Sequence, residues 1–530
     1  MGLVNWIKTR FSTNKKRNSG IIFGDNIKNI FKEAIFELND ENLAFQQAEN
    51  LVWYNGDPDY IMAFYNKVLQ DYGAIQITTG QFRRNYQNYY WTLAAKEKGI
   101  KRTHSGLPKV IIDTPIKCLG TANIRILDGD EVNEVKTKIV NEIIKDNEFN
   151  NTMNKQLKMD LVIGDGAYIL TIDKEKSDYP IIEYIDGRDV AFEYSGDKVI
   201  AVIISKQYTV DNKQYECIER RSTKRVQDKE GNYKRVATIE YQLFLNDSKK
   251  GYTPVDLSVI PQTEGLKDIQ FENIPFMLAV PCIKTMDPDT KRGTSLFKGK
   301  IDLFDDFDQN ISQESNVMRA ITPVEYIDSN LLDKDQDGNL IMPAAFGKQF
   351  VVYKGAGSYS ESPNKIDSVF HEVDFTKLSA ESLETLNRCL AGIVSPATLG
   401  LELARNSTDL SQREKEKVTL QTIKELKEYE IDVLTKLFER ALAVFDIMNN
   451  INAIPEITDV SVKFKDYANP TLDSKIQAFS NALVQGAISV DRYVEELYGD
   501  ESKEEKEKEK AYIKDYLNKS TVEDFSDLLE

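Results

Sequence analysis

The chain has 530 residues, of which 41% are hydrophobic and 29% charged, so it is long enough to bury several cores and is expected to form more than one domain. Its formal net charge is −17, from 68 basic and 85 acidic residues. A surface with that charge repels nucleic acid and anionic membranes, which excludes tight DNA binding except through a local basic patch.

Cysteine usage and hydropathy narrow the class of protein further. The four cysteines form no CxxC pair, and their spacing is typical of unpaired buried thiols in a reducing compartment; they are Cys118, Cys217, Cys282 and Cys389. No apolar run approaches the roughly 20 residues that cross a bilayer. Residues 1–25 have Trp6 where a myristoylation signal needs Ser or Thr, and they are predicted to be a basic N-terminal arm or a short docking helix.

Residues 26–120 are predicted to be mainly helical. Apolar residues recur every three or four positions in NIKNIFKEAIFELND, NLAFQQAENLVWY and YIMAFYNKVL, and the turn dipeptides Asn55-Gly56 and Asp57-Pro58 interrupt them. The aromatic run FRRNYQNYYW, with cations and His104 after it, has two interpretations. Its rings stack on nucleic-acid bases, or they pack inward from a helix, which we favour.

Between residues 161 and 282 the pattern changes to the alternation of β-strands. Segments such as GAYILTID, KVIAVIIS and ATIEYQLFL are rich in Val, Ile, Tyr and Phe and are separated by turn residues. These segments predict an antiparallel sheet. Because no helical segments alternate with them, a doubly wound nucleotide-binding sheet is not expected.

The motifs that suggest chemistry are incomplete. GTSLFKGKI resembles a phosphate-binding loop, but five residues separate Gly293 from Gly299, and Ile301 replaces the Ser or Thr that holds magnesium. Neither of the two histidines, His104 and His371, lies in a nucleophile motif. We therefore expect no catalytic residues and no cofactor, and the chain is not predicted to be an enzyme.

A second incomplete motif, DKDQDGNLI, resembles a calcium-binding loop. It has the first acidic positions and the glycine of such a loop, but Ala344 stands where the bidentate Glu belongs. The residues in question are Asp333, Asp335, Asp337 and Gly338. A solvated hairpin turn is favoured over a metal site.

Two helices enclosing a small β module are predicted in the second half. Five apolar residues at steps of three and four predict a helix at about 295–318; they are Phe297, Ile301, Phe304, Phe307 and Ile311. Short strands follow over residues 319–373. A second helix at 374–393 carries the stripe Leu383, Leu386, Leu390 and Ile393.

The segment SPATLGLELARNSTD separates this second helix from a third. Pro396 disfavours helix at Ser395, so the second helix is predicted to end there. Asp409 and Ser411 are suitable N-caps, so a long helix is predicted from about 410 to 449. The segment between them is either a packed connector or a loop presented to a partner or a lumen.

This order of parts resembles the portal proteins of tailed bacteriophages, in particular the SPP1-like family of phages of Gram-positive hosts. The resemblance lies in SLFKGKIDLFDDFDQNISQESN, the β module, CLAGIVSPATLGLE and NSTDLSQREKEK. Two flanking segments are also similar to the family: KRTHSGLPKVIIDTPIKCLG before these parts and VSVKFKDYANPTLDSKIQAFSNALVQGAISVDRYVEELYG after them. The resemblance therefore covers roughly residues 25–500.

The resemblance implies an α+β, portal-like fold with a mixed α/β wing, a two-helix stem, a small β-containing clip, a long helix and a helical C-terminal crown. It assigns the wing to 26–293, the stem helices to 294–318 and 374–393, the clip to 319–373, the tunnel loop to 394–409, the long wing helix to 410–455, and the crown with its charged tail to 456–530. The tail sequence ESKEEKEKEKAYIKDYLNK departs from the family pattern and is either a charged helix or a disordered extension.

The same resemblance implies three sets of candidate residues. The tunnel-loop candidates are Ser395, Leu399, Leu401, Glu402, Arg405 and Asn406. The candidates for an acidic face of the stem are Asp302, Asp305, Asp306 and Asp308. The candidates for partner binding on the clip are Tyr326, Asp333, Asp335, Asp337 and Tyr353.

The implied function is that of a portal, or head-to-tail connector, in which a ring of twelve subunits at one capsid vertex conducts double-stranded DNA without sequence specificity during packaging and ejection. The implied partners are the terminase large subunit, the major capsid protein and scaffold, and the head-to-tail adaptor, with no membrane. The implied location is the virion, after assembly in the host cytoplasm. A non-portal oligomeric virion scaffold or adaptor, and a nucleic-acid enzyme, remain as alternatives.

Overall fold

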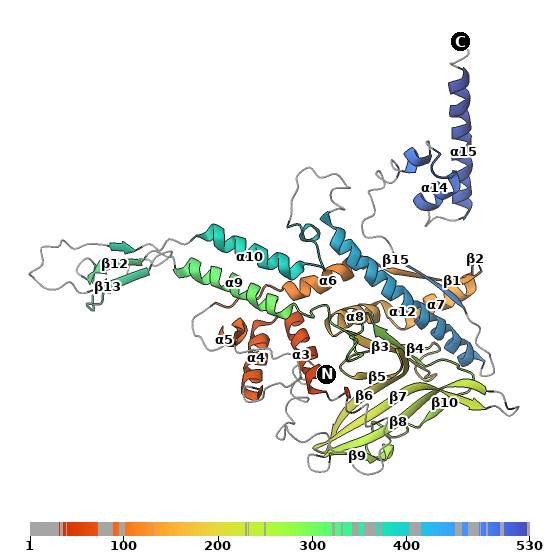
Figure 1. The fold of residues 1–530 in the computed structure, drawn as a ribbon, viewed down its shortest axis with the longest axis horizontal. Helices are drawn as coiled ribbons and strands as arrows, with labels where there is room; N and C mark the ends of the chain where they lie inside the picture. The colour runs from red at the N-terminus through yellow and green to blue at the C-terminus, as the bar shows by residue number, and fades with distance from the viewer. Residues whose placement is uncertain are drawn as a thin grey trace, which may run out of the picture. The chain divides into compact units, whose positions relative to one another are not determined.

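The computed structural model describes residues 31–72, 88–94, 101–227, 231–320, 324–353, 367–369, 374–401, 415–450, 458–464 and 476–526, with short gaps inside some of these ranges. It has the mixed α+β class that the sequence predicts (Figure 1). The predicted basic arm at 1–25 lies outside the described residues. The chain divides into a larger unit, Met1–Cys118, Ala122–Leu403 and Lys415–Lys463, and a smaller unit, Leu119–Thr121, Ala404–Glu414 and Phe464–Glu530.

The N-terminal part is helical, as predicted. Gly56, in the left-handed region at φ 67°, ends the first complete helix, and Pro58 begins the next, so the predicted turn dipeptides separate two helices. The helices are α3 (Glu41–Asn55), α4 (Pro58–Tyr72), α5 (Tyr90–Ala94) and α6 (Leu107–Leu119). The chain continues with β1 (Ala122–Asp128), β2 (Glu131–Val132), α7 (Glu134–Asp146) and α8 (Phe149–Val162).

Two antiparallel sheets follow, which confirms the antiparallel region predicted from the alternation. The larger sheet has the order β10-β8-β7-β6-β5, and β9 also pairs with β8. Its strands are β5 (Val190–Ser195), β6 (Lys198–Val210), β7 (Lys213–Gln227), β8 (Tyr233–Asp247), β9 (Gly251–Val255) and β10 (Ile269–Phe271). The smaller sheet has the order β11-β3-β4, from β3 (Asp165–Thr171), β4 (Ile181–Asp186) and β11 (Ala279–Ile283).

The hydrophobic core is divided between the faces of these sheets. Phe192 and Val202 of the larger sheet pack against Ala167 and Ile169 of the smaller one. The opposite face of the larger sheet is covered by three apolar residues before α3, which are Phe31, Ile35 and Leu38. All four cysteines are buried, as predicted.

The predicted helical pair is present as α9 (Ile301–Ala320) and α10 (Phe375–Leu390) (Figure 1). Each is shorter than predicted at the end nearest a glycine with positive φ. Gly299 has φ 76°, so α9 begins after it instead of at 295, and Gly392 has φ 79°, so α10 ends before the predicted stop at Pro396. The predicted apolar stripe of α10 is wrong at Leu383, which is 57% exposed.

Between α9 and α10 lies a three-stranded sheet of β12 (Val324–Asp328), β13 (Gln349–Tyr353) and β14 (Asp367–Val369). The central strand β12 is parallel to β13 and antiparallel to β14. After α10 comes the short 3₁₀ helix η4 (Pro396–Leu399), then α12 (Lys417–Asn449), which ends where predicted. The predicted N-caps Asp409 and Ser411 lie outside the described residues.

The last strand of the larger unit is β15 (Asp459–Phe464), which pairs with β1. The smaller unit contains α14 (Val490–Leu497) and α15 (Lys503–Ser526). Of the two alternatives for the charged tail, the helix is therefore the one found over α15. Lys506 and Lys510 of α15 form ion pairs of 3.3 and 3.1 Å with Glu495 and Asp491 of α14.

Candidate functional site

The helices α9 and α10 are joined by side-chain hydrogen bonds along their length. Asn310 on α9 donates to the Thr385 hydroxyl at 3.2 Å, and the Cys389 thiol donates to the Leu303 carbonyl at 3.3 Å. The Ser382 hydroxyl donates to Glu314 further along the pair. The pair therefore holds the small β12–β14 sheet on two connected helices.

Lys300, from the segment that resembles a phosphate-binding loop, has a structural contact. Its Nζ donates to the carbonyls of Arg388 and Ala391, at 3.0 and 2.8 Å, and so caps the C-terminal end of α10. Burial lowers the pKa of Lys300. The segment thus fixes the base of the helical pair.

The prediction of a solvent-facing acidic surface on this helix is wrong for Asp305 and Asp308, which are 4% and 0% exposed. Asp305 accepts hydrogen bonds from the backbone amides of Tyr90 and Trp91 at 2.7 and 3.3 Å. Burial raises the pKa of Asp305 to about 7. The acids face an N-terminal segment that is distant in the sequence, and of the four candidates only Asp302 and Asp306 are exposed.

Asp308 holds the other end of the same N-terminal segment. It lies 2.6 Å from His104 Nδ1 and accepts from the indole nitrogen of Trp91 at 3.0 Å and the amide of Ser105 at 2.9 Å. Tyr89, Tyr90 and Trp91 are all buried, which confirms the favoured interpretation of these residues as core; the rest of the aromatic run, 82–87, lies outside the described residues. His104 is likewise a packed residue.

The first part of the candidate tunnel loop is packed against α12. Ser395 is 4% exposed; its amide donates to the Thr419 hydroxyl at 2.8 Å, and the Thr398 and Thr419 hydroxyls lie 2.7 Å apart. Ser395 is therefore corrected from a lumen candidate to an anchor, and Leu399 is half-buried. Leu401, at 53%, is exposed.

Three of the tunnel-loop candidates, Glu402, Arg405 and Asn406, lie outside the described residues, as does His371. The segment is predicted from sequence to be either a packed connector or a loop presented to a partner or a lumen, and residues 395–399 form a packed connector. The candidate loop therefore narrows to the residues from Leu401 onward.

The small sheet carries the candidate clip residues. Tyr326 lies on the central strand β12, opposite Val351 of β13, and Tyr353 is the last residue of β13. The calcium-like stretch forms a turn closed by a Lys334–Leu340 bridge, the hairpin alternative for this motif. Asp335 accepts from the amide of Asn339 at 2.7 Å, which lowers its pKa. The three acids of this turn, Asp333, Asp335 and Asp337, are all exposed.

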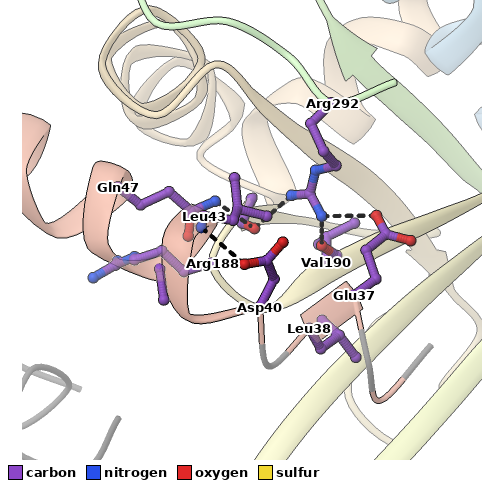
Figure 2. A pocket seen from close by; sticks show the side chains of 10 residues that line it. Glu37, Leu38, Asp40, Leu43, Gln47, Arg188, Val190 and Arg292 are labelled. Atoms are coloured by element: carbon purple, nitrogen blue, oxygen red, sulfur yellow. Dashed lines mark hydrogen bonds and ion pairs between the residues drawn. The ribbon is translucent and has the colours of Figure 1, made fainter. Parts of the chain in front are cut away.

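A buried arginine, which the sequence patterns did not indicate, joins the larger sheet (β5–β10) and the smaller sheet (β3, β4 and β11) to the N-terminal segment. Arg292 contacts both carboxylate oxygens of Asp165 at 2.8 Å. It also contacts Glu37 at 3.0 Å and donates to the carbonyls of Gly187 and Val190 (Figure 2). Burial alone lowers the pKa of Arg292, but Asp165 and Glu37 raise it above its ordinary value. The cavity beside it is about 10 Å³, room for one water molecule, so it is too small for a substrate.

A second buried network lies between α8 and α12. Gln156 Nε2 donates to Asp160 at 2.6 Å and to Glu430 at 2.8 Å, and Tyr184 and Tyr429 donate to Asp160 at 2.5 and 2.7 Å. The other oxygen of Glu430 is buried and has no hydrogen-bond partner among the described residues. Burial raises the pKa of Asp160 to about 7 and that of Glu430 to about 8. These two carboxyl groups therefore bind protons near neutral pH.

The described residues contain neither a metal site nor a membrane span. No three of their His, Cys, Asp or Glu side chains gather where they could bind a metal ion. None of their helices is both long and apolar enough to cross a bilayer.

Comparison with known proteins gives a family match and several distant structural likenesses, two of which are described below. The family model described as "Phage portal protein, SPP1 Gp6-like" matches residues 38–516. A search of curated proteins gives no match. A chain of "Neck of empty GTA particle computed with C6 symmetry" is similar at 10% identity and TM-score 0.39, with 72% of this chain and 87% of that chain covered.

A chain of "Virion of native gene transfer agent (GTA) particle" is similar at 9% identity and TM-score 0.31, with the same coverage of 72% and 87%. At these TM-scores the likenesses add nothing to the assignment, which rests on the family match over most of the chain. The chain belongs to the phage portal protein family described as SPP1 Gp6-like.

Proposed function

We propose that the protein is a portal subunit that forms a ring channel at one capsid vertex, through which double-stranded DNA is packaged and later ejected. The observation that carries this proposal is the family match over residues 38–516. The helical pair with a small sheet at its end supports it, because α9 and α10 are the proposed stem and β12–β14 the proposed clip. The proposed location is the virion, after assembly in the host cytoplasm.

The charge of the chain suits a channel in which DNA slides. Affinity for DNA grows with the number of phosphates that a protein neutralises, so a strongly basic wall would retard the duplex. A net charge of −17 avoids this. On the stem, Asp302 and Asp306 are the acidic candidates that remain exposed, but Asp302 accepts a hydrogen bond from the hydroxyl of Tyr89. We therefore propose that Asp306, and not Asp305 or Asp308, faces the channel.

The proposed partners follow from the proposed parts. The clip, with Tyr326, Tyr353 and the exposed acids of its hairpin, docks the terminase large subunit during packaging and the head-to-tail adaptor afterwards. The wing contacts the major capsid protein and scaffold. The ring is proposed to contain twelve subunits.

The proposal predicts that the purified protein forms closed rings. Electron microscopy should show rings with an axial hole, and symmetry averaging should give the number of subunits. Open or irregular oligomers would favour a scaffold or adaptor. A monomer that cuts DNA or hydrolyses ATP would favour a nucleic-acid enzyme, and either result would contradict the portal proposal.

Shortening the loop after Leu401 should impair DNA passage while sparing the fold. Deleting residues 402–406 leaves the anchored turn at Ser395 and Thr398 in place, so we expect intact rings and a loss of most of the DNA packaged into procapsids. Packaged DNA is measured by nuclease protection, with rings checked by microscopy. Leu401→Ser, at the first residue of the candidate loop, controls for folding alone: this exposed side chain has little burial to lose, so rings should persist. Normal packaging by the deletion variant would contradict the tunnel role.

A further inference from the structure

The β7–β8 hairpin extends beyond the strands on both sides of it. Pairing of β6 with β7 ends at Ala201 and Ser222, and pairing of β10 with β8 ends at Phe271 and Ala237. The β7–β8 ladder continues further, as far as the pair of Gln227 with Tyr233. Its outer part is therefore a two-stranded ribbon with no strand beside it among the described residues.

The two faces of this ribbon differ in how their charges are compensated. On one face Lys224 lies 2.7 Å from Glu240, and Lys234 lies 3.3 Å from Glu272. The other face, here called the arginine face, carries four exposed residues, which are Arg225, Gln227, Tyr233 and Arg235. Within the part of the chain that the structure describes, neither of its arginines forms an ion pair.

The arginine face brings like charges together. Arg225 and Arg235 are directly opposite each other in the register, an arrangement that destabilises a strand pair unless an anion compensates it. The Arg225 guanidinium lies over the ring of Tyr233, 4.4 Å from its centroid, and this ring is 61% exposed. Two arginines at opposite positions of the register, one with its guanidinium held against a ring, are suited to bidentate contacts with oxyanions.

The composition of the face indicates which kind of polyanion it fits. Protein–protein interfaces have an apolar centre, whereas interfaces with DNA are polar and strongly cationic. The arginine face has no aliphatic side chain. It also lies on a chain with net charge −17, so a cationic pair without an ion-pair partner among the described residues is unusual.

We propose that the arginine face binds the phosphate backbone of double-stranded DNA without sequence specificity. The choice of DNA as the polyanion rests on the proposed function. This contact is distinct from passage through the channel, since it retains the duplex at the ribbon instead of letting it slide.

The test compares two double variants of the full-length protein that each remove two positive charges from the same ribbon. The first is Arg225→Gln with Arg235→Gln, and the matched control is Lys224→Gln with Lys234→Gln on the compensated face. Binding of a fluorescently labelled duplex of random sequence is measured by anisotropy over a series of salt concentrations. Melting temperature and ring formation are recorded for each variant.

We expect the arginine variant to bind DNA about tenfold more weakly or worse at low salt, with the slope of log affinity against log salt reduced by about 2 per hairpin engaged. The lysine control should change neither value appreciably. An equal loss in both variants would show an effect of net charge alone and overturn the proposal, as would unchanged binding in both. Unchanged DNA binding with lost binding of purified capsid protein would identify a protein surface instead, and would also overturn it. Normal rings in either case would leave the portal proposal standing.

Discussion

Replacing Glu430 with Gln should prevent much of the loss of stability that the protein undergoes as the pH rises from 5 to 9. Glu430 and Asp160 are buried together, and among the described residues no cation contacts either carboxylate. Burial raises the pKa of Glu430 from its ordinary 4.5 to about 8; the hydrogen bond from Gln156 opposes this shift and the charge of Asp160 adds to it. The folded state therefore carries a proton that the unfolded chain has released.

The sign of the effect follows from that difference in proton binding. Between pH 4.5 and about 8 the folded state binds more protons than the unfolded state, so the contribution of Glu430 to the free energy of unfolding is intact below pH 4.5 and falls across this window. The loss is on the order of 3–5 kcal/mol. The hydroxyls and thiol facing the pair stay neutral because burial raises their pKa values well above the ordinary ones; they belong to Tyr168, Tyr184, Tyr429 and Cys282.

The measurement is the melting temperature by calorimetry from pH 5 to pH 9. Glu430→Gln should melt close to the parent protein at pH 5 and clearly above it at pH 9. Glu425→Gln, an exposed position on the same helix, is the matched control and should follow the parent curve. If the curves for Glu430→Gln and the parent run parallel, the buried carboxylate does not carry the pH dependence.

Arg292→Met should destabilise the larger unit by about 3–5 kcal/mol, because it leaves Asp165 buried without its cation. Asp165 is 1% exposed, and its two carboxylate oxygens accept hydrogen bonds from Nε and Nη2 of the Arg292 guanidinium. The carbonyls of Gly187 and Val190 lose their donor as well. Because these groups come from both the larger and the smaller sheet, the loss of stability should appear in the main unfolding transition.

Three control variants separate this explanation from loss of packing. Arg388→Met removes an exposed ion pair with Glu384 and should cost at most about 0.5 kcal/mol. Arg292→Lys keeps a charge but not the fork, so it should fall between the two. Adding Asp165→Asn to Arg292→Met should recover part of the loss, because the unpaired charge is gone. A double variant no more stable than Arg292→Met alone would contradict the charge explanation.

Periodicity in the sequence determined which elements form. The antiparallel strands between residues 161 and 282, the pair α9–α10 and the end of α12 at Asn449 follow from local patterns of apolar residues. Such patterns depend on neighbours within a few positions, which the sequence displays directly. The same patterns failed at Leu383, because the buried side of a helix is chosen by the element that packs on it.

Glycines with positive φ account for the misplaced helix ends. Gly299 and Gly392 stand near the predicted ends, but Phe297 and Ile393 continue the apolar period across them, so the period predicts longer helices than the glycines permit. The left-handed backbone at each glycine ends the helix although the apolar residue beyond it remains buried, with Phe297 at 0% and Ile393 at 5% exposed. A buried side chain therefore need not belong to the helix that its spacing suggests.

The sequence by itself determined the α+β class, the order of the elements and the resemblance to the portal family, because each rests on local periodicity or on order along the chain. Only the tertiary structure decided which charges face solvent. Asp305 is buried by amides more than 200 residues away, and Arg292 meets Asp165 across 127 positions, and no local pattern marks such partners. From sequence alone an acidic residue is expected to face solvent, because burying a charge is costly. Asp305 is buried here only because hydrogen-bond donors distant in the sequence compensate for that cost.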